Sequence, residues 1–170
     1  MPKTKKQETG DIGEKIAGRF LVGKGFEIIG WNYRKPWGEI DIIVRREGKI
    51  HFIEVKTVSL VSWTTTQQLG QIDRIIKSGK SFISERLNRP ELKYTIHETG
   101  DIDDKNTTDG YRPEDNLHPW KLKRLKKAIQ SYLSEKRMSE EDDWAFDAVT
   151  VRIDTKGKTA IVEYLEDIIL

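Results

Sequence analysis

Two stretches of alternating apolar and charged residues, joined by a short turn, constrain the fold of this chain more than any other feature. Residues 38–57 read GEIDIIVRREGKIHFIEVKT. The side chains of a strand point alternately to opposite faces, so isoleucines and valines at every second position predict strands with a buried face. The turn-forming REGK predicts that the two strands pair as an antiparallel hairpin. The strands also carry charges, at Glu39, Asp41, Glu54 and Lys56.

The alternation assigns these charges to faces of the hairpin. On the first strand, Glu39 and Asp41 should share one face. The opposite face should hold three apolar residues, Ile40, Ile42 and Val44. On the second strand, Glu54 and Lys56 should share a face. Because the strands are antiparallel neighbours, the two pairs of charges can converge.

Three carboxylates in one place need a counter-charge. Two carboxylates about 4 Å apart repel by roughly 4 kcal/mol at an effective dielectric near 20. A divalent cation such as Mg²⁺, or Mn²⁺, would relieve this repulsion, with carboxylates, water and substrate phosphate as its ligands. The alternative is that Lys56 pairs with Glu54 or Asp41 at a wet sheet edge while Glu39 is solvated, and such pairs contribute little to stability.

The remaining patterns predict two helices and further strands. Helical spacing indicates one helix over residues 9–24, where Asp11 and Glu14 form a D-x-x-E capping box. A second helix is expected in HPWKLKRLKKAIQSYLSEKR. Strand patterns occur in FEIIGWNYR, FDAVTVRI and TAIVEYL. This order predicts an α/β fold with a central mixed sheet flanked by helices, in a single domain of 170 residues.

Two segments are expected to lie outside this core. Residues 1–9 should form a flexible basic tail. Residues 59–109 are polar and rich in turn formers, which predicts an insertion within the domain, with a weak helix through residues 72–83 and a short strand in LKYTIHE. The chain has no cysteine, which excludes disulfides and thiolate metal sites. It carries no apolar run of membrane-spanning length and no secretory signal, so we expect a cytoplasmic protein.

Four motifs, in this order, resemble those of a known family. They are GDIGEKIA, NYR, GEIDII and FIEVKT. They are similar to those of the YraN-like family of small bacterial proteins, whose function is largely uncharacterised. The resemblance covers nearly the whole chain except the tail and the insertion. It implies a restriction-endonuclease-like fold of the PD-(D/E)xK superfamily, related to archaeal Holliday-junction resolvases. The chain departs from that pattern at Ile40, where a proline is common, and in the insertion after Thr57.

The resemblance also implies roles for the charged residues. Asp41 and Glu54 would be metal ligands, and Lys56 would position or activate the attacking water and offset negative charge in the transition state. Glu14 would complete the site from the first helix, although a capping role explains it equally well. Glu39 would be an outer-shell group or a second ligand.

Basic residues indicate a nucleic-acid partner. Lys121, Arg124 and Lys127 form one arc of the second helix, and Arg34 precedes the turn beside Glu39. Such residues could make sequence-independent phosphate contacts, although a charge run on a helix is more often a solvated face. The leading hypothesis is therefore a Mg²⁺-dependent endonuclease acting on DNA, in particular on branched, recombination or repair intermediates. The alternatives are a nucleic-acid-binding module of the same fold that does not cut, and a structural protein with ordinary salt bridges. A homodimer would suit an enzyme that cuts two strands.

Overall fold

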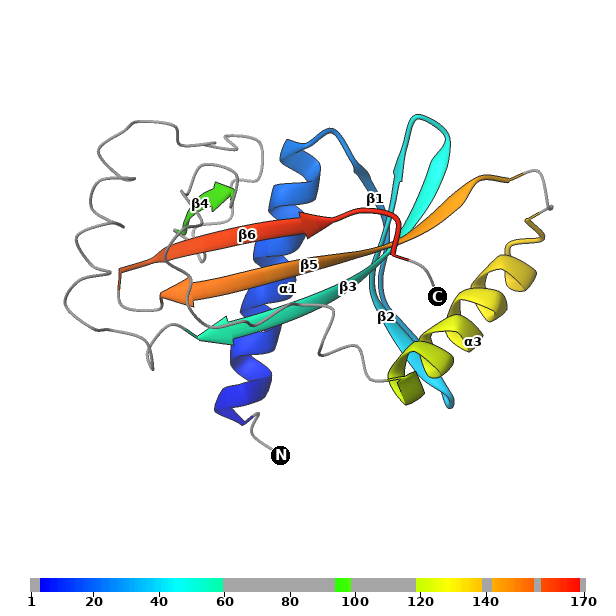
Figure 1. Ribbon diagram of the computed structural model, residues 1–170, viewed down its shortest axis with the longest axis horizontal. Coiled ribbons are helices and arrows are strands. Elements are labelled where there is room, and N and C mark those ends of the chain that lie inside the picture. Colours follow the sequence, from blue (N-terminus) through cyan, green and yellow to red (C-terminus); the bar gives the residue numbers. More distant parts are fainter. Residues whose placement is uncertain (1–3, 60–93, 99–118, 139–141, 155–156, 169–170) are drawn as a thin grey trace.

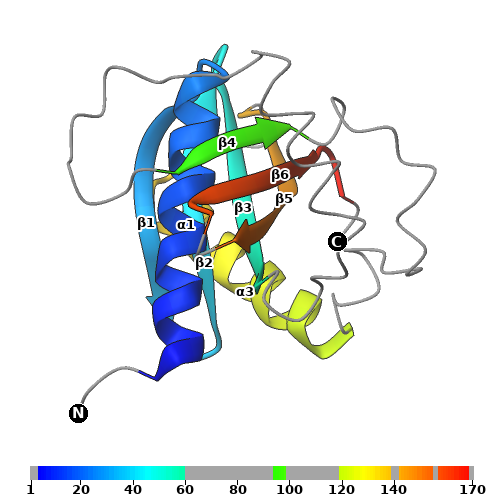
Figure 2. The same ribbon diagram turned by 90° about the vertical axis from the view of Figure 1, so that its left-hand side faces the viewer.

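The described part of the chain forms one mixed sheet between two helices. The computed structural model describes residues 4–59, 94–98, 119–138, 142–154 and 157–168. The elements in chain order are α1 (Lys5–Gly23), β1 (Glu27–Lys35), β2 (Gly38–Arg46), β3 (Lys49–Ser59), β4 (Thr95–Glu98), α3 (Pro119–Glu135), β5 (Trp144–Asp154) and β6 (Thr159–Leu165). Helix α1 covers one face of the sheet, and α3 packs against the other (Figures 1 and 2).

The six strands lie in the order β1-β2-β3-β5-β6-β4. Strands β1, β2 and β3 form an antiparallel meander. Strand β5 runs parallel to β3, and β6 returns antiparallel to β5. The predicted α/β class, with a central mixed sheet flanked by helices, is confirmed, and the topology agrees with a restriction-endonuclease-like arrangement.

Each helix buries its apolar stripe against one face of the sheet. On the α1 face, Ile16 and Leu21 pack against the isoleucines and valines of β2, β3 and β5. On the α3 face, Leu125 and Ile129 pack against Phe52 and its neighbours. These layers fix the ends of the strands relative to the helix starts, which is where the predicted site residues lie.

The start of α1 differs from the prediction. The helix begins at Lys5, with Thr4 as its N-cap and Gln7 completing a capping box. The Thr4 hydroxyl accepts from the Gln7 backbone N–H at 3.3 Å, and the Thr4 backbone N–H donates to Gln7 Oε1 at 2.8 Å. A flexible tail over residues 1–9 is therefore wrong from Lys5 onward, and residues 1–3 lie outside the described part. The capping box predicted at Asp11 and Glu14 is also wrong, because both residues lie inside the helix.

The face assignment of β2 is wrong at one residue. Ile42 and Val44 pack in the cluster under α1, as expected. Ile40, which should share their face, packs instead in the cluster under α3. The alternation of the strand is therefore interrupted between Ile40 and Ile42, at Asp41.

The cause lies in the neighbouring strand. Asn32 of β1 has φ 47°, in the left-handed region. Asparagine tolerates this conformation better than most residues. Trp31, before it, covers Gly18 of α1, whereas Tyr33, after it, packs in the cluster under α3. The pair β1–β2 thus changes faces at Asn32 and Asp41, which a strict period of two cannot predict.

The C-terminal half of the sheet contains a buried carboxylate away from the predicted site. Asp147 of β5 is fully buried. Its Oδ2 accepts from the Tyr164 hydroxyl at 2.6 Å and lies 2.7 Å from His51 Nδ1, and its Oδ1 accepts from the Asp167 backbone N–H at 2.9 Å. This satisfied network ties β3, β5 and the segment after β6 together, and it accounts for the buried His51 without a metal.

One strand of the predicted insertion joins the sheet. Strand β4, predicted in LKYTIHE, pairs in parallel with the edge strand β6. The helix expected through residues 72–83 lies outside the described residues. Neither α1 nor α3, the helices of the described ranges, is long and apolar enough to cross a membrane.

Candidate active site at the fork between β2 and β3

Strands β2 and β3 separate at the predicted carboxylates. Their antiparallel ladder ends at the pair Ile42 and Ile53. Beyond it, β2 continues beside β1, and β3 continues in parallel beside β5. The Val55 backbone N–H points into this gap and donates to Asp41 Oδ2 at 2.7 Å. We call this place, with Asp41 and Glu54 at its centre, the strand fork.

The charge of Asp41 is disfavoured at the fork. Burial is the main cause that raises the pKa of Asp41, from 3.8 to about 7. The negative charge of Glu54 raises it further, and that of Glu14 adds a smaller effect, whereas the hydrogen bond from Val55 and the charge of Lys121 lower it. Two carboxyl groups therefore compete for one buried place, which is an arrangement typical of functional sites.

Glu54 is still more buried, with 5% of its surface exposed. Burial raises the pKa of Glu54, and the ion pair with Lys121 is the strongest opposing effect. Lys121 reaches the fork from the first turn of α3, and its ammonium donates to Glu54 Oε1. This basic residue, predicted to contact phosphate, is thus the counter-ion of a buried carboxylate.

A chain of polar contacts borders the fork. The side-chain amide of Asn32 donates to Glu14 Oε2 at 2.9 Å, and Arg34 Nη2 donates to Asn32 Oδ1 at 3.1 Å. Arg34 Nε also lies 3.4 Å from Glu39 Oε2. The left-handed conformation of Asn32 therefore has two effects. It changes which face of the sheet the following residues of β1 point to, and it places the side-chain amide of Asn32 between Glu14 and Arg34. Glu39 is exposed, and its charge raises the pKa of Glu54, so it lies at the margin of the site.

A close helix–strand approach positions Glu14. Gly13 is buried, and a Cβ built on it would lie 1.8 Å from Thr57 Oγ1 of β3. Only a glycine lets α1 come this near to β3. The second glycine of GDIGE thus has a structural reason, and it carries the next residue, Glu14, to the fork.

Lys56 and Thr150 lie beyond Glu54 on adjacent strands. Lys56 is exposed, and its charge lowers the pKa of Glu54. It is paired in register with Thr150 of β5. The Thr150 hydroxyl is buried and has no hydrogen-bond partner among the described residues.

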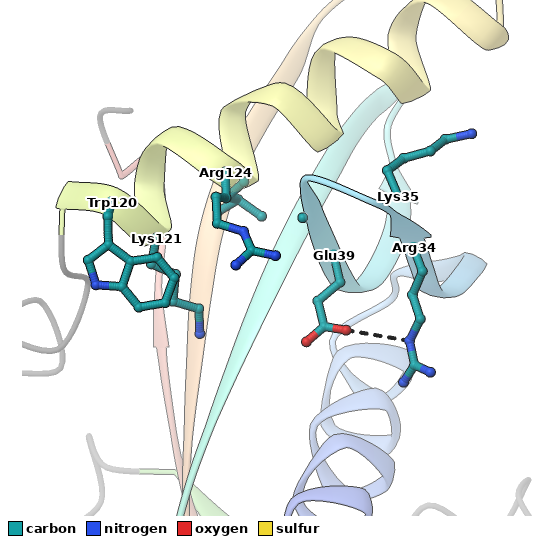
Figure 3. Close-up of a pocket in the computed structure, with 8 residues that line it drawn as sticks. Arg34, Lys35, Glu39, Trp120, Lys121 and Arg124 are labelled. Carbon is teal, nitrogen blue, oxygen red and sulfur yellow. Dashed lines mark ion pairs between the residues drawn. The ribbon is translucent and has the colours of Figure 1, made fainter.

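A groove of about 250 Å³ lies between α3 and the β1–β2 turn. Figure 3 shows Trp120, Lys121 and Arg124 on the helix side and Arg34, Lys35 and Glu39 on the strand side. Gly38 and Leu125 complete the lining. The helix and the turn meet closely at Gly38, where a Cβ would lie 2.5 Å from the Arg124 carbonyl oxygen. We call this the basic groove.

The structure gathers most of the predicted residues in these two places. Around the fork lie Asp41, Glu54, Lys56, Glu14 and Glu39. In the basic groove lie Arg34, Lys121 and Arg124. Lys127 is exposed on α3 and does not line the groove. Within the described ranges, histidine and acidic side chains form no group of three that could hold a metal ion.

Two contributors were not expected from the sequence, Trp120 and Lys35, which line the groove. Asn32 belongs to the NYR motif, but its role in orienting Glu14 was not expected. A tryptophan next to Pro119 at the polar start of an amphipathic helix was a usable signal, because it lies off the apolar stripe. The role of Asn32 depends on a backbone conformation that no residue pattern announces.

Comparisons with known proteins match the part of the chain that contains the fork. The family model of the uncharacterised protein family UPF0102 matches residues 13–103, more than half of the 170 residues. A UPF0102 protein of Synechococcus sp. (strain JA-3-3Ab) is 33% identical over 97 residues, which are 54% of this chain and 74% of the relative. One of Aliarcobacter butzleri is 38% identical over 104 residues, 58% of this chain and 90% of the relative. One of Clostridioides difficile is 47% identical over 57 residues, 34% of this chain and 50% of the relative.

Proposed function

The chain belongs to the uncharacterised protein family UPF0102, the YraN-like family that its motifs resemble, and we propose that it is a metal-dependent endonuclease that hydrolyses phosphodiester bonds in DNA. The observation that carries the proposal is the strand fork, where burial raises the pKa of the half-buried Asp41 and of the buried Glu54, and the negative charge of Glu54 raises that of Asp41 further. A fold gains nothing in stability from two such groups, which favours a chemical reason for their presence.

The donors at the fork fit a hard divalent cation. Asp41 and Glu54 would hold Mg²⁺ or Mn²⁺, because a cation would offset both the burial and the repulsion from Glu54 that raise the pKa of Asp41. Two carboxylates are enough for Mg²⁺, which takes its remaining ligands from water and substrate phosphate. When bound, the cation supplies a Lewis acid that polarises a phosphoryl oxygen and lowers the pKa of water.

The residues around the fork would serve the same reaction. The exposed ammonium of Lys56 can orient the attacking water and offset the charge that develops on the phosphoryl group. Glu14, held by Asn32, presents a further carboxylate from α1. The cations of the basic groove can bind the flanking phosphates without reading sequence. The preference for branched, recombination or repair intermediates depends on analogy of fold alone.

A cleavage assay tests the proposal. Wild type should cut DNA in Mg²⁺ or Mn²⁺ when offered single-stranded, duplex, flap and four-way-junction substrates. Asp41→Ala should abolish cutting, Lys56→Ala should lower it roughly 100-fold, and Lys127→Ala, outside both places, should retain it. Equal activity of the wild type and both site variants would identify a contaminating nuclease and refute the mechanism.

The second candidate is a nucleic-acid-binding module that does not cut. It is favoured by the Lys121–Glu54 ion pair, which already neutralises one carboxylate without a metal. A melting-temperature series separates the two candidates. A nuclease site should be stabilised by Mg²⁺ or Mn²⁺ in the wild type and not in Asp41→Ala, whereas DNA binding without any metal response would support the module. Sedimentation with and without DNA would test the homodimer.

A further inference from the structure

We propose that the basic groove holds an unpaired nucleotide, with its base stacked on the indole of Trp120 and its phosphates against the cations of the groove. This inference deepens the proposed function, since it names single-stranded or locally unpaired nucleic acid as the substrate class. It depends on the nucleic-acid partner, and it does not require the chain to cut.

The first observation is the exposure of Trp120. Its surface is 59% exposed, the highest among the large exposed hydrophobic residues of the described ranges. It lies in the first turn of α3, on the rim of the groove (Figure 3). An exposed indole at this place offers a flat aromatic face to a ligand. Stacking of a base on such a ring contributes about 1–3 kcal/mol and is tolerant of sequence.

The second observation is that a cation beside the ring is held in place. The Arg124 guanidinium carbon lies 5.8 Å from the centroid of the Trp120 ring. Arg124 Nε donates to the Trp37 carbonyl oxygen at 2.8 Å, and Trp37 Nε1 donates to Ser131 Oγ at 3.2 Å. The guanidinium is therefore fixed by the β1–β2 turn before any ligand arrives, which lowers the entropy cost of binding a phosphate there.

The third observation is the size and charge of the groove. Four of its lining residues are cations and one is an acid, Glu39, which Arg34 pairs. Its volume of about 250 Å³ is just below the roughly 300–1,000 Å³ of small-molecule sites. A groove of this volume can hold one nucleotide. A duplex, whose bases are already stacked on each other, offers no base face to the indole.

The position of Lys121 connects the groove to the fork. Lys121 lines the groove, and its ammonium reaches Glu54. A nucleotide held on Trp120 would therefore bring a neighbouring phosphodiester towards Asp41 and Glu54. The groove would select unpaired substrate, and the fork would act on the adjacent bond.

The test is a binding measurement without cleavage. Fluorescence anisotropy is recorded in EDTA with labelled oligothymidylate of about 12 nucleotides, within the usual site sizes, and with a duplex of equal length. Wild type should prefer the single strand. Trp120→Ala should weaken single-strand binding by roughly 5- to 150-fold and leave duplex binding unchanged. Trp120→Phe should retain most of the affinity, because it keeps an aromatic face.

The matched control is Trp144→Ala. Trp144 is 39% exposed, begins β5 and does not line the basic groove. The Trp144→Ala variant should bind both oligonucleotides as the wild type does. The inference is overturned if Trp120→Ala binds the single strand normally, or weakens single strand and duplex equally. If Trp120→Ala loses single-strand binding but the wild type shows no metal-dependent cleavage, nucleotide binding in the basic groove is supported and the nuclease proposal is refuted. If the wild type cleaves DNA but Trp120→Ala binds the single strand as the wild type does, the nuclease proposal is supported and nucleotide binding on Trp120 is refuted.

Discussion

Replacing Asp41 with asparagine should stabilise the metal-free protein above neutral pH. The pKa of Asp41 is about 7 in the folded chain, against an ordinary value of 3.8. Between these values the folded chain holds a proton that the unfolded chain has released. The free energy of unfolding therefore falls as pH rises from about 4 to about 7, and the loss is complete above pH 7. An asparagine has no charge to bury and should escape this loss.

The magnitude follows from the same pKa. The difference between 3.8 and about 7, at about 1.4 kcal/mol per pH unit, gives at most about 4 kcal/mol at pH 8. Asparagine is close to aspartate in size, and its carbonyl oxygen can still accept the 2.7 Å hydrogen bond from the Val55 N–H. No packing loss should offset the gain. At this chain length each kcal/mol corresponds to about 2–4 °C in melting temperature.

Urea unfolding in EDTA at pH 5 and pH 8 measures the effect. Asp41→Asn should exceed the wild type in stability at pH 8 and show a much smaller gain at pH 5. Glu47→Gln, which neutralises an exposed carboxylate in the β2–β3 turn, is the control and should change little at either pH. Adding Mg²⁺ should stabilise the wild type alone, because binding to the folded state raises stability by mass action. An Asp41→Asn variant that is less stable than the wild type at pH 8 would refute the reasoning.

Five other substitutions have distinct expected results. Lys121→Gln should destabilise the protein by about 1 kcal/mol at pH 8 in urea unfolding, since solvent screens its half-exposed ammonium. Lys56→Ala should lower cleavage roughly 100-fold and alter stability by less than about 0.5 kcal/mol, as paired kinetic and unfolding assays can show. Asp147→Asn should cost about 3 kcal/mol of stability, because a buried acceptor of several hydrogen bonds becomes partly a donor. Gly13→Ala should destabilise by about 1–3 kcal/mol, whereas Gly10→Ala, with open space around it, should stabilise by about 0.5–1 kcal/mol in thermal melts.

Much of the fold was predictable because the spacing of apolar residues within each segment indicates whether it forms a helix or a strand. The hairpin of residues 38–57, the helix after Pro119 and the strands β5 and β6 all appear where the alternation or the helical spacing placed them. The start of α1 was not predicted, because the basic and polar residues 1–9 suggested a flexible tail. Thr4 instead begins the helix with a cap that needs no apolar residue.

The site was predictable in its members and not in its geometry. Asp41 and Glu54 were expected to converge as neighbours across a hairpin. They meet instead where the ladder ends, with the Asp41 carboxylate accepting the hydrogen bond of the Val55 N–H. The reversal of faces at Asn32 and the reach of Lys121 from a helix far along the chain are tertiary effects. No pattern within either segment specifies them.

The ion pair at the fork also changes the argument about Lys56. Without a structure, this lysine could be explained as the partner of Glu54 at a wet sheet edge. The contact with Glu54 is made by Lys121, from α3, and Lys56 remains exposed beyond it. The ion pair with Lys121 explains how the buried charge of Glu54 is balanced, and no such ion pair within the described part of the chain explains Lys56. Phosphodiester hydrolysis, in contrast, needs an ammonium that can face the substrate. The proposed function therefore predicts separate roles for the two lysines. Lys121 should matter for the stability of the metal-free protein, and Lys56 should matter for the rate of cleavage.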